Sequence, residues 1–186
     1  MLCGLEVSDF GVPVDSRRIY SGRILGLRVD SVRLSGESVF RREVVEHPGA
    51  VAMLPFLDDG RVLLIRQFRY AVGEVLLEIP AGTLEKGEDP LECARRELIE
   101  ETGYEAGVLE LLFSCFLAPG YSTERIHIFV ASKLRKVGSR PEIDEEIELE
   151  PADLQTAEVM ISDGRIVDAK TISAISYYLL SRSLKR

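Results

Sequence analysis

The chain has 186 residues, of which 46% are hydrophobic and 29% are charged. This balance is typical of a folded domain and excludes a disordered chain. Acidic residues outnumber basic ones, 31 to 23, which gives a formal net charge of -8. Because a negative field repels nucleic acid and anionic membranes, we expect neither of them as a partner.

The three cysteines, Cys3, Cys93 and Cys115, are odd in number and widely spaced. They form neither a zinc-binding pattern nor the disulfide framework of a secreted protein. No basic segment followed by an apolar run marks a secretory signal, and the apolar stretches are too short to span a bilayer. We therefore expect a cytoplasmic protein in which Cys93 and Cys115 are core residues.

The N-terminal part of the chain is typical of short β-strands. Apolar and polar residues mix along residues 17–46, and Ser-Gly-Glu at 35–37 suits a turn. Asp-Asp-Gly at 58–60 suits a hairpin between two apolar strands. The predicted strands, including two after the middle of the chain, are Leu27–Leu34, Val39–Glu46, Ala50–Leu57, Arg61–Tyr70, Val108–Leu117 and Arg125–Ser132.

Three helices are predicted, at Pro90–Thr102, Pro151–Ser162 and Ala169–Ser183. In the first, Asp89 suits the N-cap, Pro90 the first helical position, and Gly103 a left-handed end. Its apolar positions recur at helical spacing; they are Leu91, Ala94 and Leu98. This mixture of helices and strands predicts an α+β fold.

Three glutamates lie close together on the first predicted helix. Glu97, Glu100 and Glu101 are spaced i, i+3 and i+4, which brings their carboxylates onto one face. Such carboxylates repel each other and destabilise the helix unless a cation lies among them. Hard divalent cations such as Mg²⁺ prefer carboxylate oxygens. An isolated pattern of this kind is more often a solvated acidic face, so the flanking sequence decides.

The flanking sequence gives these glutamates a context. Gly82 follows a sharp turn, Glu88 comes after five further residues, and after seven more the chain reads Arg-Glu-Leu-Ile-Glu-Glu-Thr-Gly-Tyr at 96–104. This spacing resembles the Nudix box, with Tyr104 at a position that is more often aliphatic. A chance match is on the order of one in ten million. The chain is therefore similar to Nudix hydrolases, which cleave diphosphates.

The resemblance implies a Nudix fold, in which a mixed β-sheet is sandwiched between helices. It also implies a metal cofactor, Mg²⁺ or alternatively Mn²⁺, held by the Ala81 carbonyl and the carboxylates of Glu97, Glu100 and Glu101. Glu100 and Arg96 are predicted to be catalytic, with Arg96 orienting the glutamates. A structural arginine that pairs with Glu92 or Glu100 fits the sequence equally well. Glu88 would brace the helix, and no nucleophilic cysteine is required.

Two segments outside the box are similar to segments of ADP-ribose pyrophosphatases. Ala-Pro-Gly-Tyr-Ser-Thr-Glu at 118–124 resembles one, and Pro119 lies close to the marker proline of that subfamily. The same segment is also typical of a plain turn between strands. Arg-Gln-Phe-Arg at 66–69 resembles a phosphate-binding segment, in which Arg69 would bind phosphate with two parallel hydrogen bonds and Arg66 would be solvated. The resemblance implies substrate binding by Arg69, Pro119 and Glu124.

Acidic residues return near residue 145, at Glu142, Asp144, Glu145 and Glu146. In ADP-ribose pyrophosphatases a loop here supplies a glutamate that acts as general base or completes the metal site. We assign this catalytic role to Glu145, with Glu146 and Glu142 as alternatives. Taken alone, the run is also typical of a solvated loop.

The resemblance extends to the N-terminal strands, which exchange between two subunits in this subfamily. It implies a dimer-forming β extension at 1–46, a Nudix domain at 47–186, and a substrate contact from Arg42 or its neighbour Arg41. The expected substrate is a small nucleoside diphosphate sugar, and the expected activity is Mg²⁺-dependent hydrolysis of ADP-ribose to AMP and ribose 5-phosphate. The alternatives are cleavage of another nucleotide sugar such as GDP-mannose, and nucleotide binding without hydrolysis.

Overall fold

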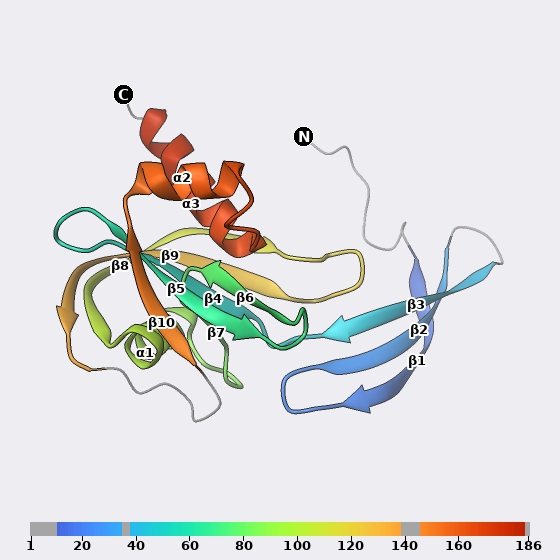
Figure 1. The fold of residues 1–186 in the computed structure, drawn as a ribbon. Coiled ribbons are helices and arrows are strands. Elements are labelled where there is room, and N and C mark those ends of the chain that lie inside the picture. The colour runs from blue at the N-terminus through green and yellow to red at the C-terminus, as the bar shows by residue number, and fades with distance from the viewer. Residues whose placement is uncertain (1–10, 35–37, 139–145, 185–186) are drawn as a thin grey trace. The chain divides into compact units, whose positions relative to one another are not determined.

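The structure, a computed structural model, describes residues 11–34, 38–138 and 146–184. Within these ranges strands and helices mix in the manner of an α+β fold (Figure 1). The elements are β1 (Val12–Ser21), β2 (Gly26–Arg33), β3 (Val39–Glu46), β4 (Ala50–Pro55), β5 (Val62–Arg69), β6 (Glu74–Glu78), β7 (Ala81–Thr83), α1 (Pro90–Thr102), β8 (Tyr104–Phe116), β9 (Arg125–Lys136), β10 (Ile147–Ala152), α2 (Leu154–Ser162) and α3 (Ala169–Ser183).

The chain divides into two compact units, of which the first contains the described residues up to Gly49 and the segment Ala118–Arg125. Its framework is an antiparallel sheet in the order β1-β2-β3. The segment joins the end of β3, because the Val45 amide donates to the Tyr121 carbonyl (2.8 Å) and the Thr123 amide donates to the Val45 carbonyl (2.9 Å). The predicted domain boundary after residue 46 stays a prediction.

The second unit contains Ala50–Leu117 and the described residues from Ile126 onwards, and it has two sheets. One sheet has the order β7-β4-β9-β8 and is mixed, because β4 is parallel to β9 and antiparallel to β7. The other sheet, β10-β5-β6, is antiparallel. The predicted mixed sheet is confirmed, and three of the strands form a sheet of their own beside it.

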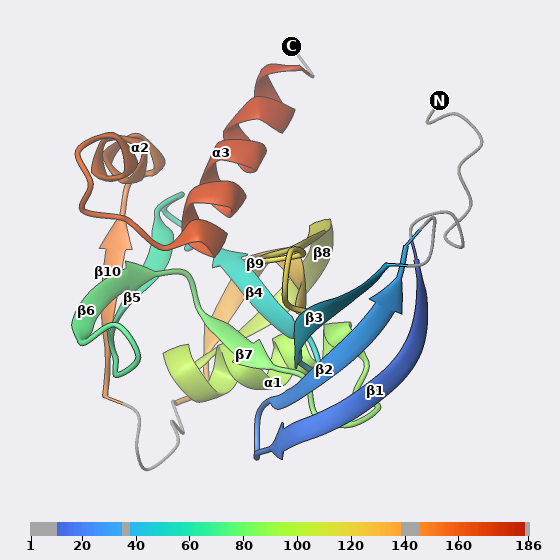
Figure 2. The ribbon, with the colours of Figure 1, turned by 90° about the vertical axis from the view of Figure 1, so that its right-hand side faces the viewer.

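Strand β4 explains why helices cover both faces of the mixed sheet. Successive side chains of a strand point to opposite faces, and β4 is buried along its whole length. Ala52 and Leu54 belong to a core cluster that includes buried residues of α2 and α3. Val51 and Met53 belong to a second cluster that includes Leu98 of α1. The sheet therefore lies between α1 and the C-terminal helices, as Figure 2 shows.

The predicted start of the second helix was wrong. We expected a helix over Pro151–Ser162, but α2 begins at Leu154. Pro151 and Ala152 instead belong to β10, where they pair with β5. Pairing with a buried strand outweighs local helical preference, which is only a weak prior. Strands β6, β7 and β10 were not predicted. None of the helices in the described ranges has the length and apolar character needed to cross a membrane.

Candidate active site

Helix α1 begins and ends as its sequence predicts. Asp89 is the N-cap, and its side chain accepts a hydrogen bond from the Leu91 amide (2.9 Å). Gly103 ends the helix in the left-handed region at φ 74°, which glycine adopts without steric cost. Leu98 is fully buried against the mixed sheet. This burial fixes the rotation of the helix about its axis, and therefore the directions in which its glutamates point.

The backbone before α1 lies directly against two of its glutamates. A Cβ atom on Gly82 would lie 1.9 Å from Cδ of Glu97, so only glycine leaves room for this carboxylate. The Ala81 amide donates a hydrogen bond to Glu101 (2.9 Å), and Glu101 is only 4% exposed. A solvated acidic face is therefore the wrong description for Glu101.

The Arg96 guanidinium connects three carboxylates of the box, those of Glu88, Glu97 and Glu100. Nε and Nη2 donate to the two oxygens of Glu88, and each of these hydrogen bonds is 3.0 Å long. Nη1 donates to Glu97 (2.7 Å) and to Glu100 (2.9 Å). The hydrogen bonds from Arg96 lower the pKa of Glu88 to about 2. Arg96 therefore pairs with Glu100 one turn away and also fixes the Glu97 carboxylate. A structural ion pair and an orienting role for Arg96 are thus compatible.

The donor set suits a hard divalent cation. Within the described ranges, no three acidic, histidine or cysteine side chains are grouped closely enough to hold a metal ion. The guanidinium of Arg96 bridges Glu97 and Glu100, while Glu101 accepts a hydrogen bond from the Ala81 amide. The residues nevertheless fit a metal by donor type and by the cradle that Gly82 leaves beside Glu97. Their role as ligands stays a prediction.

Arg69, at the end of β5, is paired with a buried carboxylate. Its Nε and Nη2 donate to Oε1 (3.0 Å) and Oε2 (2.6 Å) of Glu78, which also accepts a hydrogen bond from Lys170. Burial opposes the charge on Glu78, but the hydrogen bonds and charges of Arg69 and Lys170 outweigh it and lower the pKa of Glu78. Arg66 is exposed and pairs with Glu150 (3.0 Å), as expected for a solvated residue.

Three predicted substrate-binding residues, Arg42, Pro119 and Glu124, belong to the N-terminal unit. Arg42 is exposed on β3, and its guanidinium lies 5.8 Å from the centre of the Phe40 ring. Pro119 lies in a turn that the Tyr121 amide closes onto the carbonyl of residue 118 (3.1 Å). The segment is therefore a turn, and its part in substrate binding stays a prediction.

The predicted general base lies outside the described residues. Glu145 and its alternative Glu142 both fall within 139–145, a range that the structure does not describe. The other alternative, Glu146, is exposed and directly precedes β10. The assignment of the base therefore stays a prediction.

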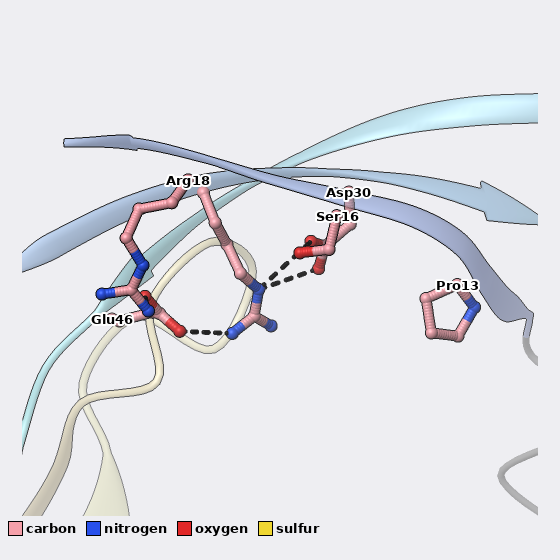
Figure 3. Close-up of a pocket in the computed structure, with 6 residues that line it drawn as sticks. Pro13, Ser16, Arg18, Asp30 and Glu46 are labelled. Atoms are coloured by element: carbon pink, nitrogen blue, oxygen red, sulfur yellow. Dashed lines mark hydrogen bonds and ion pairs between the residues drawn. The ribbon is translucent and has the colours of Figure 1, made fainter.

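A pocket of about 400 Å³ opens in the N-terminal unit, and no predicted site residue lines it. Its charged groups are already paired: Arg28 donates to Asp30 (2.9 Å) and to Glu46 (2.8 Å), and Arg18 pairs with Glu46 (2.7 Å). Figure 3 labels Arg18, Asp30 and Glu46 and marks hydrogen bonds at both carboxylates. The lining residues are Pro13, Ser16, Arg18, Arg28, Asp30 and Glu46. Because two arginines and two carboxylates neutralise one another there, we do not identify this pocket as the catalytic site.

Sequence reasoning missed Glu78 and Lys170. A signal for Glu78 exists, since it is the one charged residue in the apolar run 75–81. Nothing in the sequence links it to Lys170, because 92 positions separate the two residues. The cysteine prediction is confirmed: Cys93 is fully buried, Cys115 packs against the core, and burial raises the pKa of the Cys93 thiol to about 12.

Known proteins resemble this chain along most of its length. The chain is 40% identical to the "Methanol dehydrogenase activator" of Bacillus methanolicus and 38% identical to the "ADP-ribose pyrophosphatase" of Bacillus subtilis. Each match extends over 174 residues, which cover 92% of this chain and 94% of the relative. It is also 40% identical over 149 residues to the "GDP-mannose pyrophosphatase" of Pectobacterium atrosepticum, covering 75% of this chain and 77% of that protein.

The fold is similar to a solved structure described as "Crystal structure of ADP compounds hydrolase". The TM-score is 0.81 at 24% sequence identity, and the match covers 95% of each chain, which supports the fold. The family model described as NUDIX domain matches residues 46–174, a range that contains all of α1 and the β7 backbone that lies against it. This match and the box geometry around α1 agree: the chain belongs to the Nudix family.

Proposed function

We propose that the protein hydrolyses the diphosphate of ADP-ribose, releasing AMP and ribose 5-phosphate, with Mg²⁺ as its cofactor. The observation that carries this proposal is the packing of the box, which holds Glu97 against Gly82 and Glu101 against the Ala81 amide. The relative named ADP-ribose pyrophosphatase, which matches 92% of this chain, supports the choice of substrate.

The chemistry begins with the carboxylates of α1. Nudix hydrolases generally use a divalent metal, and Glu97, Glu100, Glu101 and the Ala81 carbonyl would hold it. When bound, Mg²⁺, or Mn²⁺ in its place, supplies charge neutralisation for the diphosphate and a water of lowered pKa. Arg96 contributes by fixing the directions of Glu97 and Glu100 through charge-assisted hydrogen bonds.

Four residues would hold the substrate. Arg69 offers the remaining N–H groups of its guanidinium to phosphate oxygens, a planar donor geometry that suits this ligand. Arg42, Pro119 and Glu124 would bind the rest of the nucleotide sugar. Glu145 would accept the proton of the attacking water, a task for which a carboxylate is suited once its pKa is set by its surroundings.

The test is the release of AMP from ADP-ribose, measured with Mg²⁺ and after chelation. We expect Glu97→Gln and Glu101→Gln to lower kcat by at least about 100-fold while the circular dichroism spectrum is retained, since each removes a charged metal ligand. Glu92→Gln is the matched control, because Glu92 is an exposed glutamate on the same helix. Normal turnover in both site variants would contradict the assignment of the ligands.

The second candidate is cleavage of GDP-mannose, which the relative named GDP-mannose pyrophosphatase favours. A panel of nucleotide sugars at one Mg²⁺ concentration distinguishes the two, and a kcat/KM for ADP-ribose below that for GDP-mannose would overturn our choice. Nucleotide binding without hydrolysis is the third alternative. Micromolar binding with no turnover in either Mg²⁺ or Mn²⁺ would support it.

We also propose a cytoplasmic homodimer in which the β extension at 1–46 exchanges between subunits. The supporting observation is β1, which is exposed along its whole length and carries the exposed apolar residues Val12, Val14 and Tyr20. An exposed apolar edge strand is suited to pairing with another chain. Light scattering tests the assembly, since a monomer has a mass of 20.7 kDa, and that mass at micromolar concentration would contradict the dimer.

A further inference from the structure

A buried carboxylate lies outside the predicted metal cluster and has no part in the chemistry above. Glu78 is the last residue of β6 and is only 1% exposed. Arg69 donates to both of its oxygens, and Lys170 donates to Oε2. Removing the charges of Glu78 and Lys170 from water is costly, and apolar residues of similar volume often replace such a buried pair without loss of stability. Stability alone is therefore a weak explanation for this arrangement.

The Glu78 carboxylate is held from the side of α3. Lys170 has a side chain that is 11% exposed, and its ammonium also lies 3.1 Å from Asp168, the N-cap of the helix. The hydroxyl of Thr171 accepts a hydrogen bond from the amide of Ile79, the residue after Glu78 (2.9 Å). Both the side chain of Glu78 and the backbone that follows it are thus fixed to the first turn of α3.

Arg69 is the most solvent-accessible member of the charged cluster formed by Lys170, Glu78 and Arg69. Its side chain is 35% exposed, whereas that of Glu78 is 1% exposed. The contacts with Glu78 use the Nε and Nη2 edge of the guanidinium. A guanidinium carries five N–H donors, so a fork of two hydrogen bonds fixes its plane and leaves donor capacity for a phosphate.

A short backbone segment connects this cluster to the Nudix box. After Glu78, the Pro80 carbonyl accepts a hydrogen bond from the Met53 amide of β4 (2.9 Å), and the Ala81 amide donates to Glu101 (2.9 Å). In Figure 2 the chain passes along this segment from β6 into β7. Glu78, which accepts the hydrogen bonds of Arg69, and Ala81, whose amide contacts Glu101, are therefore parts of one fixed stretch of backbone.

We propose that Glu78, fixed by Lys170, is a positioning residue for substrate binding: it orients the Arg69 guanidinium toward the diphosphate. The inference rests on the proposed function, in which Arg69 binds phosphate. A purely structural ion pair would change stability and leave KM unaffected. A positioning residue instead changes KM through Arg69, because an arginine that is free to rotate loses entropy when it binds.

The experiment is a double-mutant cycle measured as KM and kcat for ADP-ribose in Mg²⁺. We expect Glu78→Gln to raise KM about tenfold with kcat within about twofold of wild type, as for the loss of uniform binding energy. In an Arg69→Ala background, Glu78→Gln should add nothing to KM, since its effect passes through that side chain. Glu150→Gln is the matched control on the exposed face of the same sheet, where it removes the partner of Arg66 and should leave both constants unchanged.

Each outcome decides a different claim. If Arg69→Ala raises KM and a folded Glu78→Gln does not, the positioning role is overturned while the phosphate-binding role of Arg69 stands. If neither variant changes KM, the phosphate-binding role of Arg69 and the positioning role of Glu78 are both overturned. If the wild type does not hydrolyse ADP-ribose, the proposed function itself fails. If Glu78→Gln does not fold, Lys170→Met is used in its place. This variant removes the cation that fixes Glu78 and keeps the two hydrogen bonds between Arg69 and Glu78. We then expect KM to rise about threefold, and an unchanged KM overturns the proposal.

Discussion

The carboxylate of Glu97 occupies the space that a side chain at Gly82 would fill, since a Cβ there would come within 1.9 Å of Cδ of Glu97. Leu98, the next residue along α1, is fully buried, so the helix has no freedom to turn Glu97 away. Glycine is needed at this position for its small size. The backbone before the helix and the carboxylate on it are therefore matched to each other.

A first prediction concerns this close contact. We expect Gly82→Ala to lower kcat/KM for ADP-ribose by about 100-fold, because a displacement of about 1 Å at a catalytic group has an effect of this size. The control is Gly164→Ala, where φ is 80° and no atom lies near the added methyl group. It should cost about 1 kcal/mol of stability and leave the activity unchanged. Gly82→Ala with wild-type activity would show that the contact is unimportant.

A second prediction concerns Arg96 as the counter-charge of the box. In the absence of metal, Arg96→Gln leaves neighbouring carboxylates without their cation, so Tm should fall by about 4 °C. Addition of Mg²⁺ should then raise Tm more in the variant than in the wild type, because the cation replaces the lost charge. Thermal unfolding with and without Mg²⁺ measures both effects. Arg95→Gln, which removes an exposed arginine of the same helix, should behave as wild type.

A third prediction concerns the pH dependence of the pair formed by Glu88 and Arg96. Hydrogen bonds from Arg96 lower the pKa of Glu88 from 4.5 to about 2. Because the folded-state pKa is the lower one, the stabilisation is complete above about pH 4.5 and is lost as the pH falls through 2. Glu88→Gln should cost about 2 kcal/mol at pH 7, and the difference from wild type should shrink below pH 4.5.

Urea unfolding of the wild type and Glu88→Gln across this acidic range gives the measurement for that prediction. A difference between the two proteins that is the same at pH 7 and pH 3 would contradict an ionised Glu88 as its source.

A fourth prediction concerns the packing that orients α1. Leu98→Ala should lower the free energy of unfolding by about 3 kcal/mol, since it leaves a cavity between the helix and the mixed sheet. Leu180→Ala, on an exposed face of α3, should cost less than about 1 kcal/mol. Denaturant unfolding compares the two variants. Equal losses would indicate that burial of Leu98 does not fix the helix.

The sequence predicts α1 and its glutamates well because their determinants are local. Asp89, Pro90 and Gly103 set the two ends of the helix, and these bounds are confirmed. The spacing of Glu97, Glu100 and Glu101 along that helix follows directly from its geometry. The family assignment rests on the same short stretch and is confirmed by the match over 46–174.

Features that depend on distant residues could not be predicted in the same way. Pro151 was expected in a helix, but its place is decided by pairing with β5. The pairing of Glu78 with Lys170 joins residues 92 positions apart, for which a single sequence has no signal. Substrate-binding roles for Arg42 and Pro119 depend on contacts with a ligand, so both stay predictions.

The parallel pairing of β4 with β9 has a consequence for how the protein is made. Ala50 pairs with Ile126 in this ladder, and the entire Nudix box lies between the two partners in the sequence. A ribosome therefore releases the glutamate helix before the strand that completes its supporting sheet has been synthesised. Closing so long a loop is entropically slow. We expect the nascent enzyme to acquire its catalytic competence late, when β9 adds to the sheet beneath α1.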